Sequence, residues 1–212
     1  KHYSDSISWW CSEPDSGQTE AINKGFAHTD GEIMAWLNAD DMLVPGGISR
    51  VVKYLASNND VDVVYGHRIL VNEQDQEIGR WVLPPHSDRI LTWSDFIPQE
   101  TLFWRRPVWE KVGGVLDESF HFAMDWDLLL RFRAAGATMV RLPHFLGLFR
   151  VHPAQKTCAE MKETGEREMT RLRVRSLGYS PTKNQVTAHT LNYLLEARFL
   201  EFMIMAGIIT YE

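Results

Sequence analysis

Two adjacent carboxylates, Asp40 and Asp41, directly follow a mostly apolar segment at residues 33–37. This pattern predicts a buried strand that presents the acidic pair at the carboxyl edge of a sheet, where open α/β sheets place ligands. Adjacent carboxylates repel each other unless a cation lies beside them, and oxygen ligands suit Mg²⁺ or Mn²⁺. The pair therefore predicts a cation and phosphate site; the simpler alternative is a turn before Pro45-Gly46-Gly47.

A second acidic motif, Asp125-Trp126-Asp127, opens a predicted helix over residues 125–135. A rigid carboxylate at a helix start could remove a proton from a substrate hydroxyl, which makes Asp125 a candidate general base. Trp126 could stack on the apolar face of a sugar, and a core position is the common alternative for such a Trp. The structural alternatives for the acids are an N-cap role for Asp125 and an ion pair of Asp127 with Arg131.

A third candidate is the segment Arg150-Val151-His152, at the end of a predicted extended segment. Imidazole can join carboxylates around Mn²⁺, and a guanidinium can offset phosphate charge. A histidine at a strand end is also common as a structural residue. The sequence alone leaves both roles open for His152.

The elements that must position these residues alternate between strands and helices, which predicts an α/β fold. The expected strands are 33–37, 61–65, 68–72, 77–82, 98–104 and 139–151, with a short strand-like piece at 7–10. The expected helices are 18–28, 45–57, 107–112, 125–135, 160–176 and a long amphipathic helix to the end. The inward face of the helix at 45–57 is predicted to be Ile48, Val51, Val52 and Leu55.

Composition restricts the class of protein. A chain of 212 residues with 44% hydrophobic and 24% charged residues can bury one full core. A net charge of −6 without a cluster of basic residues argues against a nucleic-acid partner. Cys11 and Cys158 are too few for a disulfide framework, and neither a signal peptide nor a transmembrane segment is evident. We expect a cytoplasmic protein, with the membrane periphery as an alternative.

The ordered motifs resemble the inverting glycosyltransferases of family 2, which have the GT-A fold. The similarity covers roughly residues 7–157. The motifs that carry it are Ser12-Glu13-Pro14-Asp15-Ser16-Gly17-Gln18, Ala21-Ile22-Asn23-Lys24-Gly25, Gly31-Glu32, Trp36-Leu37-Asn38-Ala39-Asp40-Asp41, Gln99, Phe103-Trp104-Arg105-Arg106, Val112-Gly113-Gly114, Asp117-Glu118, Met124-Asp125-Trp126-Asp127-Leu128 and Phe149-Arg150-Val151-His152-Pro153.

The resemblance implies a hexosyltransferase-like enzyme that moves a sugar from a nucleotide-diphospho-sugar to an acceptor hydroxyl with inversion. It implies Mn²⁺ or Mg²⁺ as the cofactor and a saccharide or lipid-linked acceptor. The implied site residues are Asp125 as the base, Asp15, Asp40, Asp41 and Arg150 for the donor, Asp41 and His152 for the metal, and Gln99 and Trp126 for the acceptor. In many relatives the position of Asn38 in this DXD-like motif is also acidic.

The resemblance also implies a domain division and a missing front end. Residues 1–157 would form a partial GT-A-like (Rossmann-like) domain with a mixed sheet flanked by helices, and residues 158–212 a helical extension packed on it. The family's first strand, helix and strand, which carry much of the nucleoside pocket, have no counterpart here. We therefore expect an open edge near residues 7–10 with Trp9, Trp10 and Trp36 uncovered, and self-association through that edge.

Two other functions compete with sugar transfer. A catalytically silent binding or structural remnant of the same fold is the first, and the missing front end is the feature that favours it. A metal-dependent nucleotidyltransferase is the second. It is disfavoured because the chain has no glycine-rich phosphate loop bearing Lys or Arg.

Overall fold

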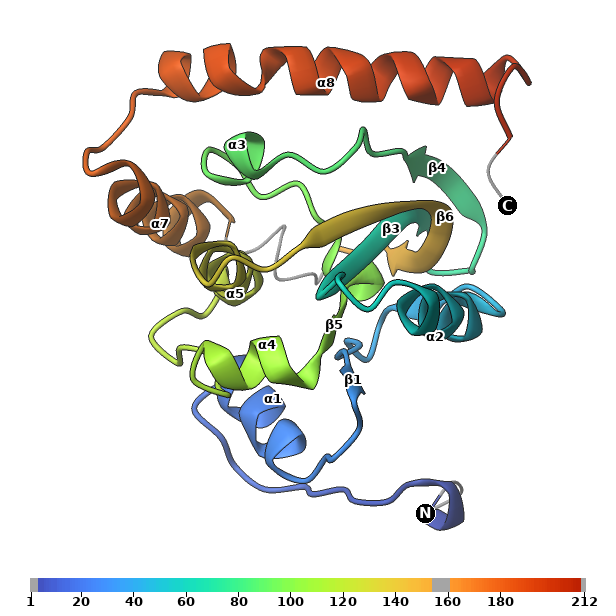
Figure 1. The fold of residues 1–212 in the computed structure, drawn as a ribbon, viewed down its shortest axis with the longest axis vertical. Helices are drawn as coiled ribbons and strands as arrows, with labels where there is room; N and C mark the ends of the chain where they lie inside the picture. Colours follow the sequence, from blue (N-terminus) through green and yellow to red (C-terminus); the bar gives the residue numbers. More distant parts are fainter. Residues whose placement is uncertain (1–3, 154–160, 211–212) are drawn as a thin grey trace.

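The computed structural model describes residues 4–153 and 161–210 (Figure 1). The α-helices are α1 (Gln18–Ala27), α2 (Gly47–Ser57), α3 (Asp88–Leu91), α4 (Arg106–Lys111), α5 (Met124–Ala134), α7 (Glu166–Leu177) and α8 (Lys183–Met205). The strands are β1 (Ile33–Met34), β2 (Met42–Leu43), β3 (Val63–Val71), β4 (Glu77–Trp81), β5 (Phe103–Arg105) and β6 (Met139–Arg150). Cys158 and the predicted domain boundary lie outside the described residues.

The strands form one mixed sheet in the order β1-β5-β3-β6-β2. β4 also pairs with β3, at residues 68–71, whereas β5 pairs with β3 at residues 63–64. The long pair β3 and β6 is parallel, from Val63 opposite Met139 to Val71 opposite Arg150. The other pairs are antiparallel. The predicted α/β class with a mixed sheet is therefore confirmed, and the hairpin predicted around residues 73–76 is the β3–β4 connection.

The sheet has an apolar core on each face because side chains alternate along β3. Val63 and Tyr65 belong to the larger core, which the helices α1, α4 and α5 complete. Val64 points to the other face and packs in a smaller core with Val51 and Leu55 of α2. Figure 1 shows α2 beside the sheet on one side and α1, α4 and α5 on the other.

The two strands predicted at 61–65 and 68–72 are one strand, β3. Gly66, between the two predicted segments, serves close packing. A Cβ atom at this position would lie 2.6 Å from the carbonyl oxygen of His144 on β6. Glycine thus lets the two parallel strands approach each other.

Three predicted strands are shorter than expected or absent. Only Ile33–Met34 of the segment 33–37 pairs, and the chain then leaves the sheet towards β2. In the segment 98–104, residues Gln99–Thr101 form a 3-10 turn before β5. The piece 7–10 forms no strand, so the prediction that the sheet begins there is wrong.

The helix predicted from Pro45 begins at Gly47, and only half of its predicted inward face is buried. Val51 and Leu55 are buried, whereas Ile48 and Val52 are 55% and 45% exposed. Residues four apart share a face, and Val51 and Leu55 share the face that packs in the smaller core with Leu142 and Leu146 of β6.

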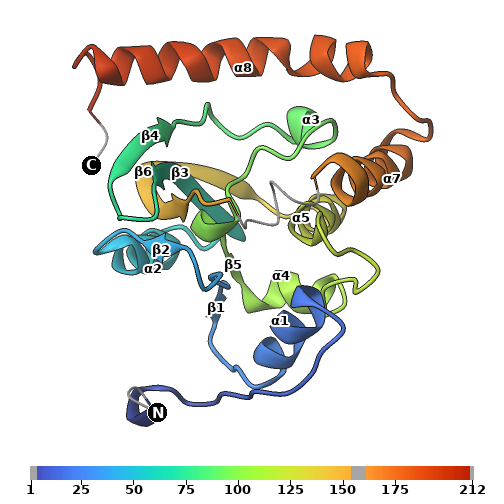
Figure 2. The ribbon, with the colours of Figure 1, turned by 180° about the vertical axis from the view of Figure 1, so that it is seen from behind.

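The carboxyl-terminal part is helical, as predicted. Figures 1 and 2 show α8 lying across one end of the molecule, with α7 beside α5. Tyr193 and Ala197 of α8 are buried, but Leu194, Leu195 and Phe199 are exposed, so apolar side chains occupy both sides of this helix. Within residues 4–153 and 161–210, no helix is long and apolar enough to cross a membrane.

Self-association through the open edge remains a prediction. Among the described strands, β1 pairs with β5 alone. Trp9 and Trp10 are 37% and 63% exposed, whereas Trp36 is only partly exposed. Unpaired edges and exposed apolar surface promote pairing between chains. We expect sedimentation velocity to show concentration-dependent association that Trp10→Ser weakens. A strictly monomeric protein at high concentration would contradict the expectation.

Candidate active site

A cavity of about 740 Å³ brings most of the predicted site residues together. Asp40 and Asp41 reach it from the loop between β1 and β2, Asp125 from the start of α5, and Gln99 from the turn before β5. The remaining walls come from α1, β3, β4, β6 and the segment around α7. Residues 85 positions apart in sequence, Asp40 and Asp125, thus face one space.

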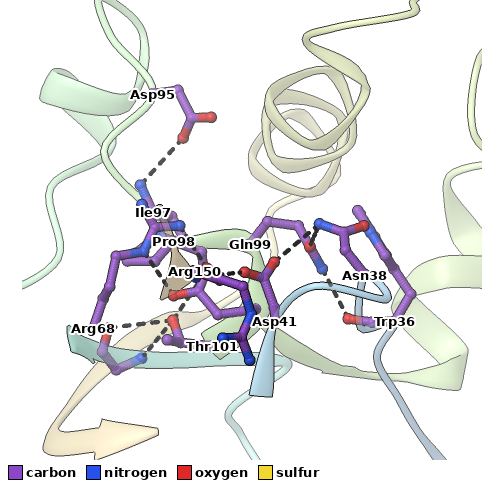
Figure 3. A network of polar contacts seen from close by, with 12 residues as sticks. Trp36, Asn38, Asp41, Arg68, Asp95, Ile97, Pro98, Gln99, Thr101 and Arg150 are labelled. Carbon is purple, nitrogen blue, oxygen red and sulfur yellow. Dashed lines mark hydrogen bonds and ion pairs between the residues drawn. The ribbon is translucent and has the colours of Figure 1, made fainter. Parts of the chain in front are cut away.

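Asn38 is the centre of a hydrogen-bond network that fixes the acidic loop (Figure 3). Its amide nitrogen donates to Asp41 Oδ2 at 3.2 Å and to Gln99 Oε1 at 3.0 Å. Its carbonyl oxygen accepts from Gln18 Nε2 at 2.7 Å. Gln99 in turn donates to the main-chain oxygen of Trp36 at 2.8 Å. An aspartate at position 38 could not donate to Asp41, so the amide suits this arrangement.

Asp40 is the carboxylate that meets His152. Its Oδ2 lies 3.0 Å from His152 Nε2, and its side chain is 40% exposed. Asp40 and His152 are therefore neighbours, although they are 112 positions apart. With Asp41, they are the residues that the resemblance implies for the metal and the diphosphate. The neighbour of His152 is Asp40 rather than Asp41, to which the sequence assigned the metal.

Arg150 supports the acidic loop from behind. Its Nε donates to the main-chain oxygen of Asp40 at 3.0 Å, and its backbone N–H donates to Asp41 Oδ1 at 3.3 Å. Its guanidinium also forms an ion pair with Asp75 in the β3–β4 turn. Because Arg150 does not line the cavity, the structure gives it a supporting position and leaves its predicted contact with the donor as a prediction.

The environment of Asp41 disfavours the ionised form of its carboxyl group. Only 7% of the residue is exposed. The pKa of Asp41 is raised to about 6: burial and then the nearby charge of Glu100 raise it, while the hydrogen bonds from Asn38 and from the Arg150 N–H offset part of the rise. A buried carboxylate held this way is stabilised by a cation.

Glu100 and Arg68 form a buried ion pair in the cavity wall. Arg68 Nε donates to Glu100 Oε1 at 2.6 Å, and the Glu100 side chain is fully buried. Gly147 on β6 makes room for it, since a Cβ atom there would lie 2.6 Å from Glu100 Cγ. The sequence analysis missed both charges; an acidic residue inside the apolar run at 98–104 was the available signal.

Asp125 is partly buried in the first turn of α5, and its Oδ1 accepts from the N–H of Trp126 at 2.8 Å. The N-cap is Ala123, so the N-cap interpretation of Asp125 is wrong. A second carboxylate that the sequence analysis missed, Asp95, lines the same cavity. Burial raises the pKa of Asp95 well above its usual range, and the charge of Asp125 adds to this rise.

Trp126 cannot stack on an acceptor in this conformation, because it has no exposed surface. Its indole nitrogen donates to the main-chain oxygen of Leu91 at 2.8 Å, within the larger core. The core alternative therefore describes Trp126 in this conformation, although Trp126 borders the cavity, and its predicted contact with an acceptor stays a prediction. Gln99 lines the cavity, but its amide oxygen accepts from Asn38 and its amide nitrogen donates to the main chain of Trp36. Its role in acceptor binding stays a prediction.

Asp15 lies away from the cavity lining, in the turn before α1. Its Oδ1 accepts from the N–H of Gly17 at 3.0 Å in an exposed position. The turn predicted at residues 15–17 is thus present. The contact of Asp15 with a donor that the resemblance implies stays a prediction.

Asp127 pairs with Arg131, as the structural alternative predicted, at 2.8 Å between Oδ2 and Nε. The pair was expected to be exposed, and this is wrong: Asp127 is fully buried and also bonds Arg175 of α7 at 2.6 Å. Removing one member of a buried ion pair leaves the other charges uncompensated. Asp127 is therefore a structural acid that ties α5 to α7.

Asp127→Asn should destabilise the protein by about 2 kcal/mol, less than for a fully buried pair because both arginines retain some solvent contact. Urea unfolding measures this difference. Glu77→Gln is the matched control, since its pair with Arg80 is exposed on both sides and should contribute less than about 1 kcal/mol. Equal effects of the two substitutions would contradict a buried structural role for Asp127.

The sequence model of glycosyl transferase family 2 matches residues 11–124, which is more than half of the chain. The chain belongs to this family. The match spans the acidic loop, the turn with Gln99 and the entry to α5, so the family region contains most of the cavity.

Curated relatives of this family 2 chain carry glycosyltransferase names. An uncharacterized glycosyltransferase of Mycobacterium tuberculosis (strain ATCC 25618 / H37Rv) is 28% identical over 59% of this chain and 47% of its own length. An uncharacterized glycosyltransferase of Nostoc sp. (strain PCC 7120) is 26% identical over 74% of this chain and 51% of its own length. The chain thus spans about half the length of the curated relatives it matches.

Solved structures confirm the GT-A-like fold class. The structure of S. aureus TarS 1-349 in complex with UDP-GlcNAc matches with a TM-score of 0.54 at 13% identity, over 84% of this chain and 52% of that chain. The complex of the same protein with UDP matches with a TM-score of 0.52 at 14% identity, over 84% and 50%. At this identity the similarity establishes the fold alone.

Proposed function

We propose that this family 2 chain transfers a sugar from a nucleotide-diphospho-sugar to an acceptor hydroxyl, with inversion at the anomeric carbon. The observation that carries the proposal is the single cavity that holds both the acidic loop, Asp40 and Asp41, and the separate carboxylate Asp125. A transfer of this kind needs one group to stabilise the leaving diphosphate and another to activate the acceptor.

A divalent cation, Mn²⁺ or Mg²⁺, fits the donor end of the cavity. Among the described residues, five acidic side chains line the cavity, and Arg68 is the one basic side chain there. A nucleoside diphosphate is itself an anion, so its binding beside Asp40 and Asp41 requires added positive charge. Asp40, Asp41 and His152 would hold the cation. Such an ion usually completes its coordination with substrate phosphates and water, and it would stabilise charge on the leaving diphosphate.

The described part of the chain contains no group of three or more Asp, Glu, His or Cys side chains placed to hold a metal by themselves. Asp40, Asp41 and His152 would therefore need ligands from the donor's phosphates to hold the cation. Asn38 and the backbone of Arg150 orient Asp41, while His152 contacts Asp40. These contacts hold the two carboxylates in place before the donor binds, which lowers the entropic cost of binding.

Asp125, in the same cavity, is the proposed base. It lies on the rigid first turn of α5, with one carboxylate oxygen bound to the Trp126 N–H. Phe122, Met124 and Met169 form an apolar wall nearby that would exclude water and strengthen electrostatic effects. A carboxylate beside an apolar wall suits a saccharide or lipid-linked acceptor, which has both hydroxyl groups and apolar surface.

The test is a transfer assay with the full-length protein, Mn²⁺ and a panel of nucleotide-sugars that begins with UDP-GlcNAc, which is bound in the similar TarS structure. We expect release of a nucleoside diphosphate and a product of inverted anomeric configuration by NMR. A retained configuration would overturn the proposed geometry. Release of pyrophosphate would instead favour a nucleotidyltransferase, and binding without turnover the catalytically silent alternative.

A further inference from the structure

The loop that leads into α5 is held by an acidic side chain from the carboxyl-terminal part of the chain. Glu168 of α7 accepts hydrogen bonds from three consecutive backbone N–H groups. His121 donates to Oε1 at 2.9 Å, and Phe122 and Ala123 donate to Oε2 at 2.8 and 2.9 Å. Glu168 itself is only 3% exposed.

These bonds hold the loop that ends at the N-cap of α5, a helix without a side-chain cap of its own. Its N-cap residue, Ala123, has no side chain able to accept a hydrogen bond, and buried N–H groups need an acceptor. The buried carboxylate of Glu168 supplies the acceptors for the backbone N–H groups of residues 121–123, directly before the helix. Hydrogen bonds to an ionised acceptor are stronger than those between neutral groups. The loop therefore has a defined position.

The rest of α7 reinforces the same contact. At its start, a Cβ atom on Gly165 would lie 3.1 Å from the ring of Phe122, so this turn packs directly on the loop. Nearer its end, Arg175 bonds the buried Asp127. Met169 also lines the cavity. These contacts place α7 over the first turn of α5 (Figure 1), although α7 lies beyond the region that the family sequence model matches.

We propose that Glu168 is a positioning residue for Asp125, which lies two residues after the loop it holds. This inference rests on the proposed role of Asp125 as the base. The carboxylate of Glu168 fixes residues 121–123, and the loop fixes the direction from which Asp125 enters the cavity. A displacement of about 1 Å in a catalytic group is enough to cost about 10²-fold in rate.

The test compares Glu168→Ala and Glu168→Gln with Glu166→Gln in the full-length protein. Glu166 lies on the same helix, but it is exposed and contacts only Lys183 among the ion pairs of the described residues, so it is the matched control. We expect kcat per folded molecule to fall by about 10² in Glu168→Ala. The loss should be smaller in Glu168→Gln, which retains one accepting oxygen, and the donor KM should stay nearly unchanged.

Amide hydrogen exchange supplies a readout that does not depend on activity. Protection at residues 121–123 should be lost in Glu168→Ala and kept in the Glu166→Gln control. Unchanged protection, or a kcat per folded molecule equal to that of the control, would overturn the inference. If the wild-type protein transferred no sugar at all, the proposed function would fail, and hydrogen exchange would still decide whether Glu168 holds the loop.

Discussion

Asp125→Asn should lower kcat by a factor of about 10² to 10⁴, the usual range for loss of a general base. Asparagine keeps the shape of the side chain and an oxygen that can accept from the Trp126 N–H, so the start of α5 should remain intact. Donor affinity should be nearly unchanged because Asp40 and Asp41 lie on a different loop. Steady-state kinetics combined with a donor binding isotherm separates these two effects.

Asp127→Asn is the informative comparison within the same motif. Both substitutions replace an acid by its amide in the first turn of α5, but Asp127 is buried against Arg131 and Arg175 and does not line the cavity. Its effect should therefore be on stability, with kcat per folded molecule retained. If transfer survives Asp125→Asn but collapses on Asp127→Asn in a folded protein, the roles of the two acids are reversed.

Asp41→Asn should weaken Mn²⁺-dependent binding of a nucleoside diphosphate by about 100-fold or more, since changes even to groups that only support a metal ligand cost about 10- to 100-fold. The fold should lose little stability, because a neutral amide suits a position that is 7% exposed and close to Glu100. Titration calorimetry with and without Mn²⁺ measures the binding.

Asp60→Asn is the control for this substitution, since Asp60 is exposed in the turn after α2. Asp40→Asn should weaken binding as Asp41→Asn does, because Asp40 is the carboxylate beside His152. If the Asp41→Asn protein bound a nucleoside diphosphate with undiminished dependence on Mn²⁺, Asp41 would have no part in holding the cation.

The sequence predicted the site best where chemistry and local pattern coincide. Asp40, Asp41 and Asp125 each follow or begin a regular element, and the α/β alternation predicts that such ends meet at one edge of a sheet. The family resemblance assigned His152 to a metal site with Asp41, whereas in the structure His152 contacts Asp40. Apolar periodicity located β6, α5 and α7 but not their ends, because pairing partners decide where a strand stops.

What the sequence did not reveal are contacts whose partners are far apart in the chain. Arg68 pairs with Glu100 across 32 residues of sequence. Glu168 accepts hydrogen bonds from the loop before α5 across 45 or more residues. The local pattern singles out Glu100, an acid inside an apolar run, but it does not identify Arg68 as its partner, and it does not distinguish Glu168 from a solvated charge. The burial of Trp126 was also not evident from the sequence: its neighbour Asp125 is partly exposed at the cavity, while one residue further along the helix the side chain lies in the core.

The central claim, that this cavity binds a nucleoside diphosphate through a divalent cation, is tested most directly by thermal unfolding of the full-length protein. Nucleoside diphosphates, UDP first, are added with and without Mn²⁺. A ligand present at 100 times its dissociation constant should stabilise the folded state by about 2.7 kcal/mol, and only when Mn²⁺ is also present. No stabilisation by any nucleoside diphosphate with Mn²⁺, or equal stabilisation in a variant carrying both Asp40→Asn and Asp41→Asn, would contradict the claim.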